Sequence, residues 1–111
     1  MFPVALLLAG GAIAADPALV ARADELNERY TQCLFAVSRD AQERAIPEDR
    51  FPALLAASCE GERDQMHQVF VAVQVQRGNP QAKAEAAWQR VESEGRAGVE
   101  RAYRIGRRLS Q

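Results

Sequence analysis

The chain has 111 residues and a mass of 12.2 kDa, with 48% hydrophobic and 26% charged residues. This length corresponds to one small domain and excludes two domains of ordinary size. Fourteen basic residues nearly balance fifteen acidic ones, which argues against nucleic-acid binding because such domains carry a basic excess. Alanine is abundant while β-branched and aromatic residues are sparse, so the composition favours an all-α fold.

The amino-terminal segment has the features of an export signal. Residues 4–15, VALLLAGGAIAA, carry no charge and are too few to span a bilayer, which takes about 20 apolar residues. A secretory signal peptide combines such an apolar core with a small-residue cleavage site, which Ala12-Ile13-Ala14 supplies. We therefore expect residues 1–15 to be a signal peptide cleaved after Ala14 or Ala15, and the mature protein to be periplasmic or secreted.

Two observations qualify this export signal. Met1-Phe2-Pro3 contains no lysine or arginine, whereas a signal peptide usually begins with positive charge. Either translation starts upstream, or the segment is instead a short buried helix or an apolar tail. No cysteine follows the apolar run, which argues against a lipid anchor. Residues 16–111 are expected to form a single helical domain.

The two cysteines, Cys33 and Cys59, lie 26 positions apart. An even number of cysteines in a short exported chain predicts a disulfide. Their separation excludes a C-x-x-C redox motif, and with a single histidine they do not complete the four ligands of a structural zinc site. The alternative is a pair of buried free thiols in a cytosolic protein.

The first two predicted helices are separated by a proline break. Asp16 and Pro17 are typical of an N-cap and a first helical residue, and Pro47 disfavours helix at Ile46. The apolar stripe of this first helix contains Leu19, Ala23, Leu26, Tyr30, Cys33 and Val37. A second, continuous helix is expected from Phe51 or Pro52 to Arg77, with a stripe of Leu55, Cys59, Met66, Phe70 and Val73, and with Val69 beside it.

A third helix is expected after Gly78, with Asn79 as its N-cap and Pro80 at its first position. Its apolar positions alternate by four and three, which predicts a helix with an apolar stripe of Ala84, Trp88, Val91, Gly95, Gly98, Ala102, Ile105 and Leu109. The predicted fold is a three-helix antiparallel bundle, or a helical hairpin plus a third helix, with one disulfide between the first two helices. The three stripes either close into one core or leave one face free for a homodimer.

The segments around the cysteines resemble a group of exported proteins. Tyr30-Thr31-Gln32-Cys33-Leu34-Phe35 and Ala56-Ala57-Ser58-Cys59-Glu60-Gly61-Glu62 are similar to a Y-x-x-C-[LV]-F … A-x-x-C-x-x-E pattern. That pattern occurs in small exported proteobacterial α-helical proteins of unknown function. The resemblance covers about thirty residues, implies an exported helical protein with one disulfide, and implies no activity.

Candidate catalytic and metal-binding residues are few. His67 is the single histidine, and Ser58 lies nine residues away, about 13 Å along a helix, so they do not form a nucleophile–base pair. Glu60, Glu62 and Asp64 would spread around a helix, whereas calcium needs six to eight converging oxygens. We predict no enzymatic activity, no cofactor and no metal site, and we expect Trp88 and Tyr103 to be core or interface anchors.

Charge is distributed unevenly along the chain. Residues 16–64 carry six basic and eleven acidic side chains. The carboxyl-terminal segment has one acidic residue, Glu100, beside five arginines, which are Arg96, Arg101, Arg104, Arg107 and Arg108. These arginines could interact with the helix dipole and the acidic segment, or they could form a patch for an anionic partner or membrane surface.

Together these features predict a non-enzymatic periplasmic or secreted helical module that binds another protein or an envelope component. The first alternative is a small envelope stress chaperone that exposes its apolar helix faces. The second alternative is an enzyme of unknown class. Neither a membrane span nor nucleic-acid binding is expected.

Overall fold

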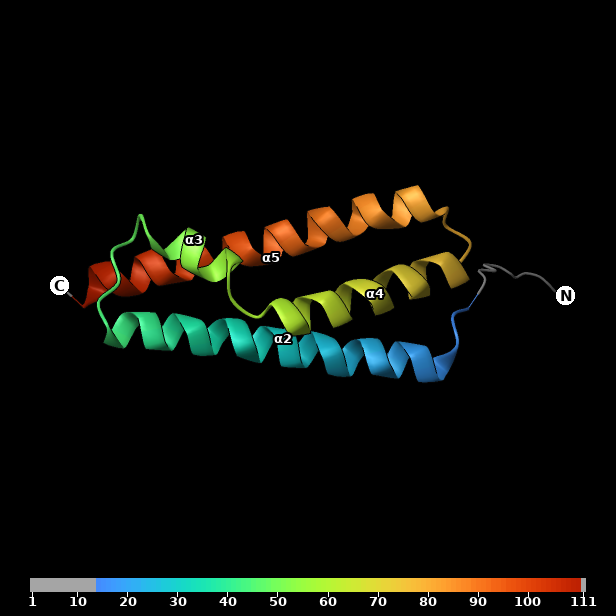
Figure 1. Ribbon diagram of the computed structural model, residues 1–111, viewed down its shortest axis with the longest axis horizontal. Coiled ribbons are helices and arrows are strands. Elements are labelled where there is room, and N and C mark those ends of the chain that lie inside the picture. Colours follow the sequence, from blue (N-terminus) through green and yellow to red (C-terminus); the bar gives the residue numbers. More distant parts are fainter. Residues whose placement is uncertain (1–13, 111) are drawn as a thin grey trace, which may run out of the picture.

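The computed structural model describes residues 14–110, where every regular element is an α-helix (Figure 1). The helices are α2 (Pro17–Glu43), α3 (Phe51–Ala56), α4 (Glu60–Gln76) and α5 (Gln81–Leu109). The predicted all-α class and the Cys33–Cys59 disulfide are confirmed. Residues 1–13 of the predicted signal peptide lie outside the described residues. None of the described helices is long and apolar enough to cross a bilayer.

Two long helices flank two shorter ones. α2 and α5 run in the same direction along the molecule. α3 followed by α4 runs in the opposite direction, from the end of α2 to the start of α5 (Figure 1). α4 packs against both long helices in one half of the molecule, and α3 contacts both in the other half. The break between α3 and α4 therefore lies near the middle of the molecule.

The helix ends follow local rules, with one correction. The Asp16 side chain accepts a hydrogen bond from the Ala18 N–H at 3.0 Å, and Pro17 is the first helical residue, as predicted. α4 ends in a Schellman motif around Gly78, whose φ is 97°. The predicted Asn79 N-cap of α5 is wrong, because Pro80 occupies that position. The Asn79 amide instead donates to the Gln74 side chain at 2.8 Å.

The second predicted helix is also wrong, because it is interrupted at residues 57–59. Cys59 adopts a left-handed conformation, with φ 61° and ψ 32°, and the Ser58 hydroxyl donates to the Leu54 carbonyl at 2.7 Å. Between Cys33 and Glu43 α2 rises about 15 Å, whereas the six residues of α3 rise only about 9 Å. The non-helical residues make up this difference and bring Cys59 level with Cys33, with a Cα–Cα distance of 6.1 Å.

The core forms two apolar clusters. One joins α2, α3 and α5, where the rings of Phe51 and Tyr103 stack with centroids 3.9 Å apart. The Tyr103 hydroxyl donates to the Ile46 carbonyl oxygen at 2.5 Å, and it lies 3.2 Å from the Ala41 carbonyl oxygen. The other cluster joins α4 and α5 around Trp88. Trp88 and Tyr103 are thus both core residues, as predicted.

The predicted apolar stripe of α5 is only partly buried. Ala84 and Trp88 are buried, but farther along α5 the buried positions are Glu92, Val99 and Tyr103. The rest of the stripe is mostly exposed, with 48% of Val91, 56% of Ile105 and 82% of Leu109 accessible to solvent. A strict heptad stripe drifts by about 20° per heptad around a straight helix. The stripe already leaves the core directly after Trp88, where Glu92 is buried in place of Val91.

Candidate functional site

An apolar groove of about 440 Å³ lies between α2 and α5. Its α2 wall includes Thr31, Leu34 and the half-exposed Phe35, and Met66 of α4 also lines it. Its α5 wall consists of Trp88, Val91, Glu92, Gly95, Arg96, Gly98, Val99 and Ala102. The groove exists because the apolar stripe of α5 turns outward, so that small and apolar residues meet solvent beside α2.

A buried carboxylate lies at one wall of this groove. Glu92 is 8% exposed and accepts a hydrogen bond from the Tyr30 hydroxyl at 3.0 Å. Arg96, one helical turn farther along α5, donates to both oxygens of Glu92, with an Nη2–Oε1 distance of 3.2 Å. Because a buried charge is costly unless it is paired and hydrogen-bonded, these two partners account for a carboxylate between the apolar clusters.

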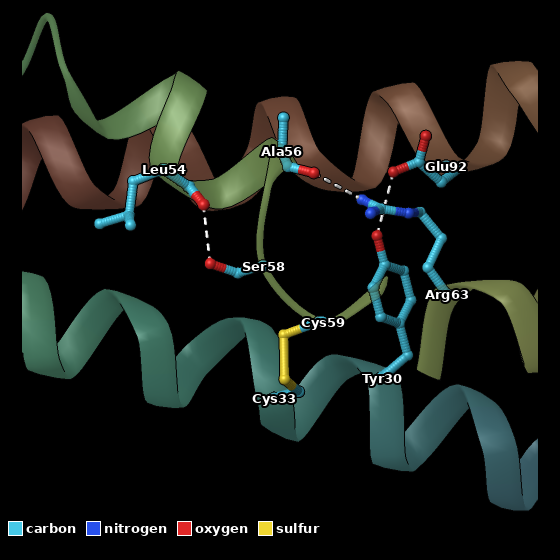
Figure 2. Close-up of a disulfide and its surroundings, with 8 residues drawn as sticks. All are labelled: Tyr30, Cys33, Leu54, Ala56, Ser58, Cys59, Arg63 and Glu92. Carbon is cyan, nitrogen blue, oxygen red and sulfur yellow. Dashed lines mark hydrogen bonds between the residues drawn. A yellow bond between two sulfur atoms is a disulfide. The ribbon is translucent and has the colours of Figure 1, made fainter. Parts of the chain in front are cut away.

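The polar cluster of Tyr30, Glu92 and Arg96 lies beside the non-helical segment between α3 and α4 (Figure 2). Arg63 of α4 donates to the Ala56 carbonyl at 3.0 Å, a group that the end of α3 leaves without a helical partner. Figure 2 shows Arg63 beside the Tyr30–Glu92 hydrogen bond, with the disulfide on the adjacent turn of α2. The disulfide, the helix break and the buried carboxylate thus form one connected region.

Burial and the neighbouring carboxylate change the proton affinity of Tyr30. Desolvation of the phenolate is the larger cause, followed by the hydrogen bond to Glu92, and together they raise the pKa of Tyr30 to about 12. The hydrogen bond to Glu92 also raises the pKa of Arg96 above its ordinary value. At neutral pH Tyr30 is therefore a neutral donor and Arg96 a permanent cation.

His67 lies in a smaller polar groove of about 340 Å³ between α4 and α5. Its Nε2 atom is 2.5 Å from Glu85 Oε1, and its ring stacks on Trp88 with centroids 5.2 Å apart. The carboxylate and the indole orient the imidazole and hold α4 against α5. These contacts are those of a packing residue at the boundary of the core.

The acidic residues at the start of α4 do not converge on a common point. Glu60 and Glu62 lie in the first turn of α4, where negative charge interacts favourably with the helix dipole. Among residues 14–110, no three histidine, cysteine, aspartate or glutamate side chains are placed so that they could hold one metal ion.

The five predicted patch arginines do not share one environment. Arg96 belongs to the Glu92 cluster, and Arg108 lies 3.8 Å from Glu48 in a largely exposed ion pair. Arg107 and Arg108 occupy the last turn of α5, where positive charge favours the helix dipole. The use of Arg101, Arg104, Arg107 and Arg108 by an anionic partner stays a prediction.

Sequence reasoning did not single out several residues of the groove, among them Glu92 and Phe35. Glu92 follows Trp88 by four residues and precedes Arg96 by four, so an i, i+4 ion pair next to an apolar stripe was the available signal. Phe35 lies about 160° around the first helix from the predicted apolar stripe, so the stripe assigned it no partner.

No protein-family model matches the chain, and no curated protein or solved structure matches it significantly.

Proposed function

We propose that the protein is an exported binding module whose α2–α5 groove accepts the apolar face of a helix from a partner protein. The observation that carries this proposal is the apolar lining of the groove beside two half-exposed side chains, Phe35 and Val91. An amphipathic helix laid in such a groove buries apolar side chains at i, i+3, i+4 and i+7. Burial of large apolar side chains on both sides supplies the free energy of binding.

The disulfide supports the location outside the cytoplasm. Cytosolic thiols are kept reduced, whereas the periplasm and the extracellular space allow disulfides to persist. Intact-mass measurement of protein expressed with its own amino terminus tests export. We expect the loss of residues 1–14 or 1–15 together with the two hydrogens of one disulfide. A full-length reduced chain would contradict export.

Trp88 provides a direct assay for groove binding, because it is the single tryptophan of the chain and lines the groove. We expect its fluorescence to change saturably when a designed amphipathic helical peptide of leucine, alanine, glutamate and lysine is added. Phe35→Asp should abolish the change, whereas Val75→Asp, at a 42% exposed apolar position of α4 outside the groove lining, should not. No change in the wild type, or equal effects of both variants, would contradict the proposal.

The exposure of Ile105 and Leu109, outside the groove lining, favours a second candidate, a stress chaperone. Such a chaperone would hold unfolded clients on exposed apolar surface. It would suppress the aggregation of a reduced model client such as insulin, and Ile105→Glu would weaken that suppression. Peptide binding in the groove without any suppression of aggregation would favour the binding module.

A further inference from the structure

The part of the α5 stripe that faces solvent forms an apolar face that no other helix within residues 14–110 covers. We call it the α5 outer face, and it contains Val91, Gly95, Gly98, Ala102, Ile105 and Leu109. Val91, Ile105 and Leu109 are the exposed large side chains of this face. The arrangement of the face, the positions of its glycines and the charges beside it all bear on what covers it.

We propose that the α5 outer face pairs with the same face of a second copy of this chain, with the two α5 helices antiparallel and a two-fold axis between Gly95 and Gly98. This inference rests on the proposed function, because four of the six residues of the face also line the α2–α5 groove, so that the helix lying there would be α5 of the second copy. In a two-fold interface the same patch must be complementary to itself.

The spacing of the face meets this requirement. A two-fold axis midway between Gly95 and Gly98 places Gly95 opposite Gly98 of the second copy. The same axis places Val91 opposite Ala102 of the second copy, because positions 91, 95, 98 and 102 are spaced by four, three and four and so have the same pattern in both directions. Ile105 and Leu109 lie beyond this central set, level with Trp88 and Ala84 of the second copy. Antiparallel helices that interdigitate along such a stripe have the geometry of a coiled-coil seam.

Within residues 14–110, no backbone packs closely against the two central glycines. A Cβ atom on Gly95 would meet nothing within 4 Å, and one on Gly98 would meet only Arg101 Nη2 at 3.7 Å. By contrast, a Cβ on Gly106 would lie 2.5 Å from Gln42 Nε2. Glycine weakens a helix relative to alanine, and its use is to let another backbone approach closely. At Gly95 and Gly98 the approaching backbone is that of the second α5.

Phe35 lies at the same level as the centre of the face. The hydrogen bonds from Tyr30 to Glu92 and from Tyr103 to Ala41 each join residues 62 positions apart. Because α2 and α5 run in the same direction (Figure 1), the same offset places Phe35 level with Ala97. The half-exposed Phe35 rings of two copies are therefore brought to the same level, beside the two-fold axis.

The charges beside the face complement one another under the same axis. Glu94 and Arg101 are exposed and lie on the same edge of the face, seven residues apart. Antiparallel pairing about the proposed axis places Glu94 of one copy beside Arg101 of the other, twice in each dimer. Charge pairs at such flanking positions select partner and orientation in coiled coils. A parallel pairing would instead place this edge of each helix against the opposite edge of the other, so that Glu94 and Arg101 would not meet.

Sedimentation equilibrium of the oxidised protein, expressed with its own amino terminus, tests the pairing at low salt. We expect a monomer–dimer equilibrium in the wild type. Glu94→Arg and Arg101→Glu should each raise the dimer dissociation constant by about tenfold, because two ion pairs become two like-charge contacts. The double variant Glu94→Arg/Arg101→Glu should restore dimerisation. The matched control Arg77→Glu, at the exposed end of α4, should leave it unchanged.

Gly95→Leu provides a second test that separates pairing from folding. The open space around Gly95 should leave the helical circular dichroism of the monomer unchanged, while the leucine should abolish the dimer. A dimer that tolerates Gly95→Leu and both charge changes would overturn the pairing. So would a wild type that stays monomeric at all concentrations. A monomer that still binds the helical peptide at Phe35 would leave the proposed function standing, whereas one that binds no peptide would contradict both proposals.

Discussion

The Tyr30 hydroxyl donates a 3.0 Å hydrogen bond to the buried Glu92 carboxylate, which joins α2 to α5 at the level where α3 gives way to α4. The two apolar core clusters lie on either side of this level. The hydrogen bond therefore connects the two long helices where the middle of the molecule has no continuous helix between them.

Replacing Tyr30 with phenylalanine should destabilise the protein more than the same change at Tyr103. Tyr30→Phe removes a hydrogen bond to a buried charge, which costs about 1.5–3 kcal/mol, whereas Tyr103→Phe removes one to neutral carbonyls, which costs about 0.5–1.5 kcal/mol. Urea unfolding followed by circular dichroism measures both values. Equal losses would mean that the Glu92 contact contributes no more than an ordinary hydrogen bond.

The raised pKa of Tyr30 predicts a loss of stability at alkaline pH. Because its folded-state pKa of about 12 exceeds the unfolded value near 10, the neutral phenol contributes fully below about pH 10. This contribution is lost as the pH rises from about 10 to about 12, and it amounts to about 2–3 kcal/mol. Free energies of unfolding measured across this range should fall more steeply in the wild type than in Tyr30→Phe. Parallel curves would contradict the shifted pKa.

Removal of the disulfide should cost about 3–4 kcal/mol on the chain-entropy account, given the 26-residue separation of the cysteines. The left-handed conformation of Cys59 adds a second, separable effect. In Cys33→Ala/Cys59→Gly the glycine accepts this conformation freely, so this variant should be about 1 kcal/mol more stable than Cys33→Ala/Cys59→Ala. Thermal unfolding of both variants measures the difference. The reverse order would indicate that the left-handed turn at residue 59 disappears with the disulfide.

Ala45 offers a stabilising change. It ends α2 with a φ of 52° in a Schellman motif, in which the Ile46 N–H donates to the Ala41 carbonyl at 3.0 Å. Glycine is the residue that usually occupies this position, so Ala45→Gly should raise the free energy of unfolding by about 0.5–1 kcal/mol. Ala53→Gly, at an exposed position inside α3, should lower it by a similar amount. A loss of stability in both variants would contradict the assigned helix end.

The sequence alone determined the features that depend on neighbouring residues. The Asp16 cap, the proline after it and the end of the second helical segment near Gly78 follow from the local chemistry of the backbone. The all-α class follows from composition and periodicity. The cysteine pairing was also within reach, because the chain offers only two cysteines.

Tertiary structure alone decided which side of α5 is buried and where the middle segment breaks. Whether Val91 or Glu92 faces inward depends on a rotation of α5 about its own axis by the angle between adjacent residues, about 100°. In the buried position Glu92 accepts a hydrogen bond from Tyr30, which lies 62 positions away in the sequence. Likewise, residues 57–59 leave the helix because Cys59 must come level with Cys33. Local propensities differ by less than about 1 kcal/mol per ordinary residue, whereas these long-range contacts are worth more. The groove depends on which side of α5 is buried and on the interruption between α3 and α4, so it appears only once the helices are packed.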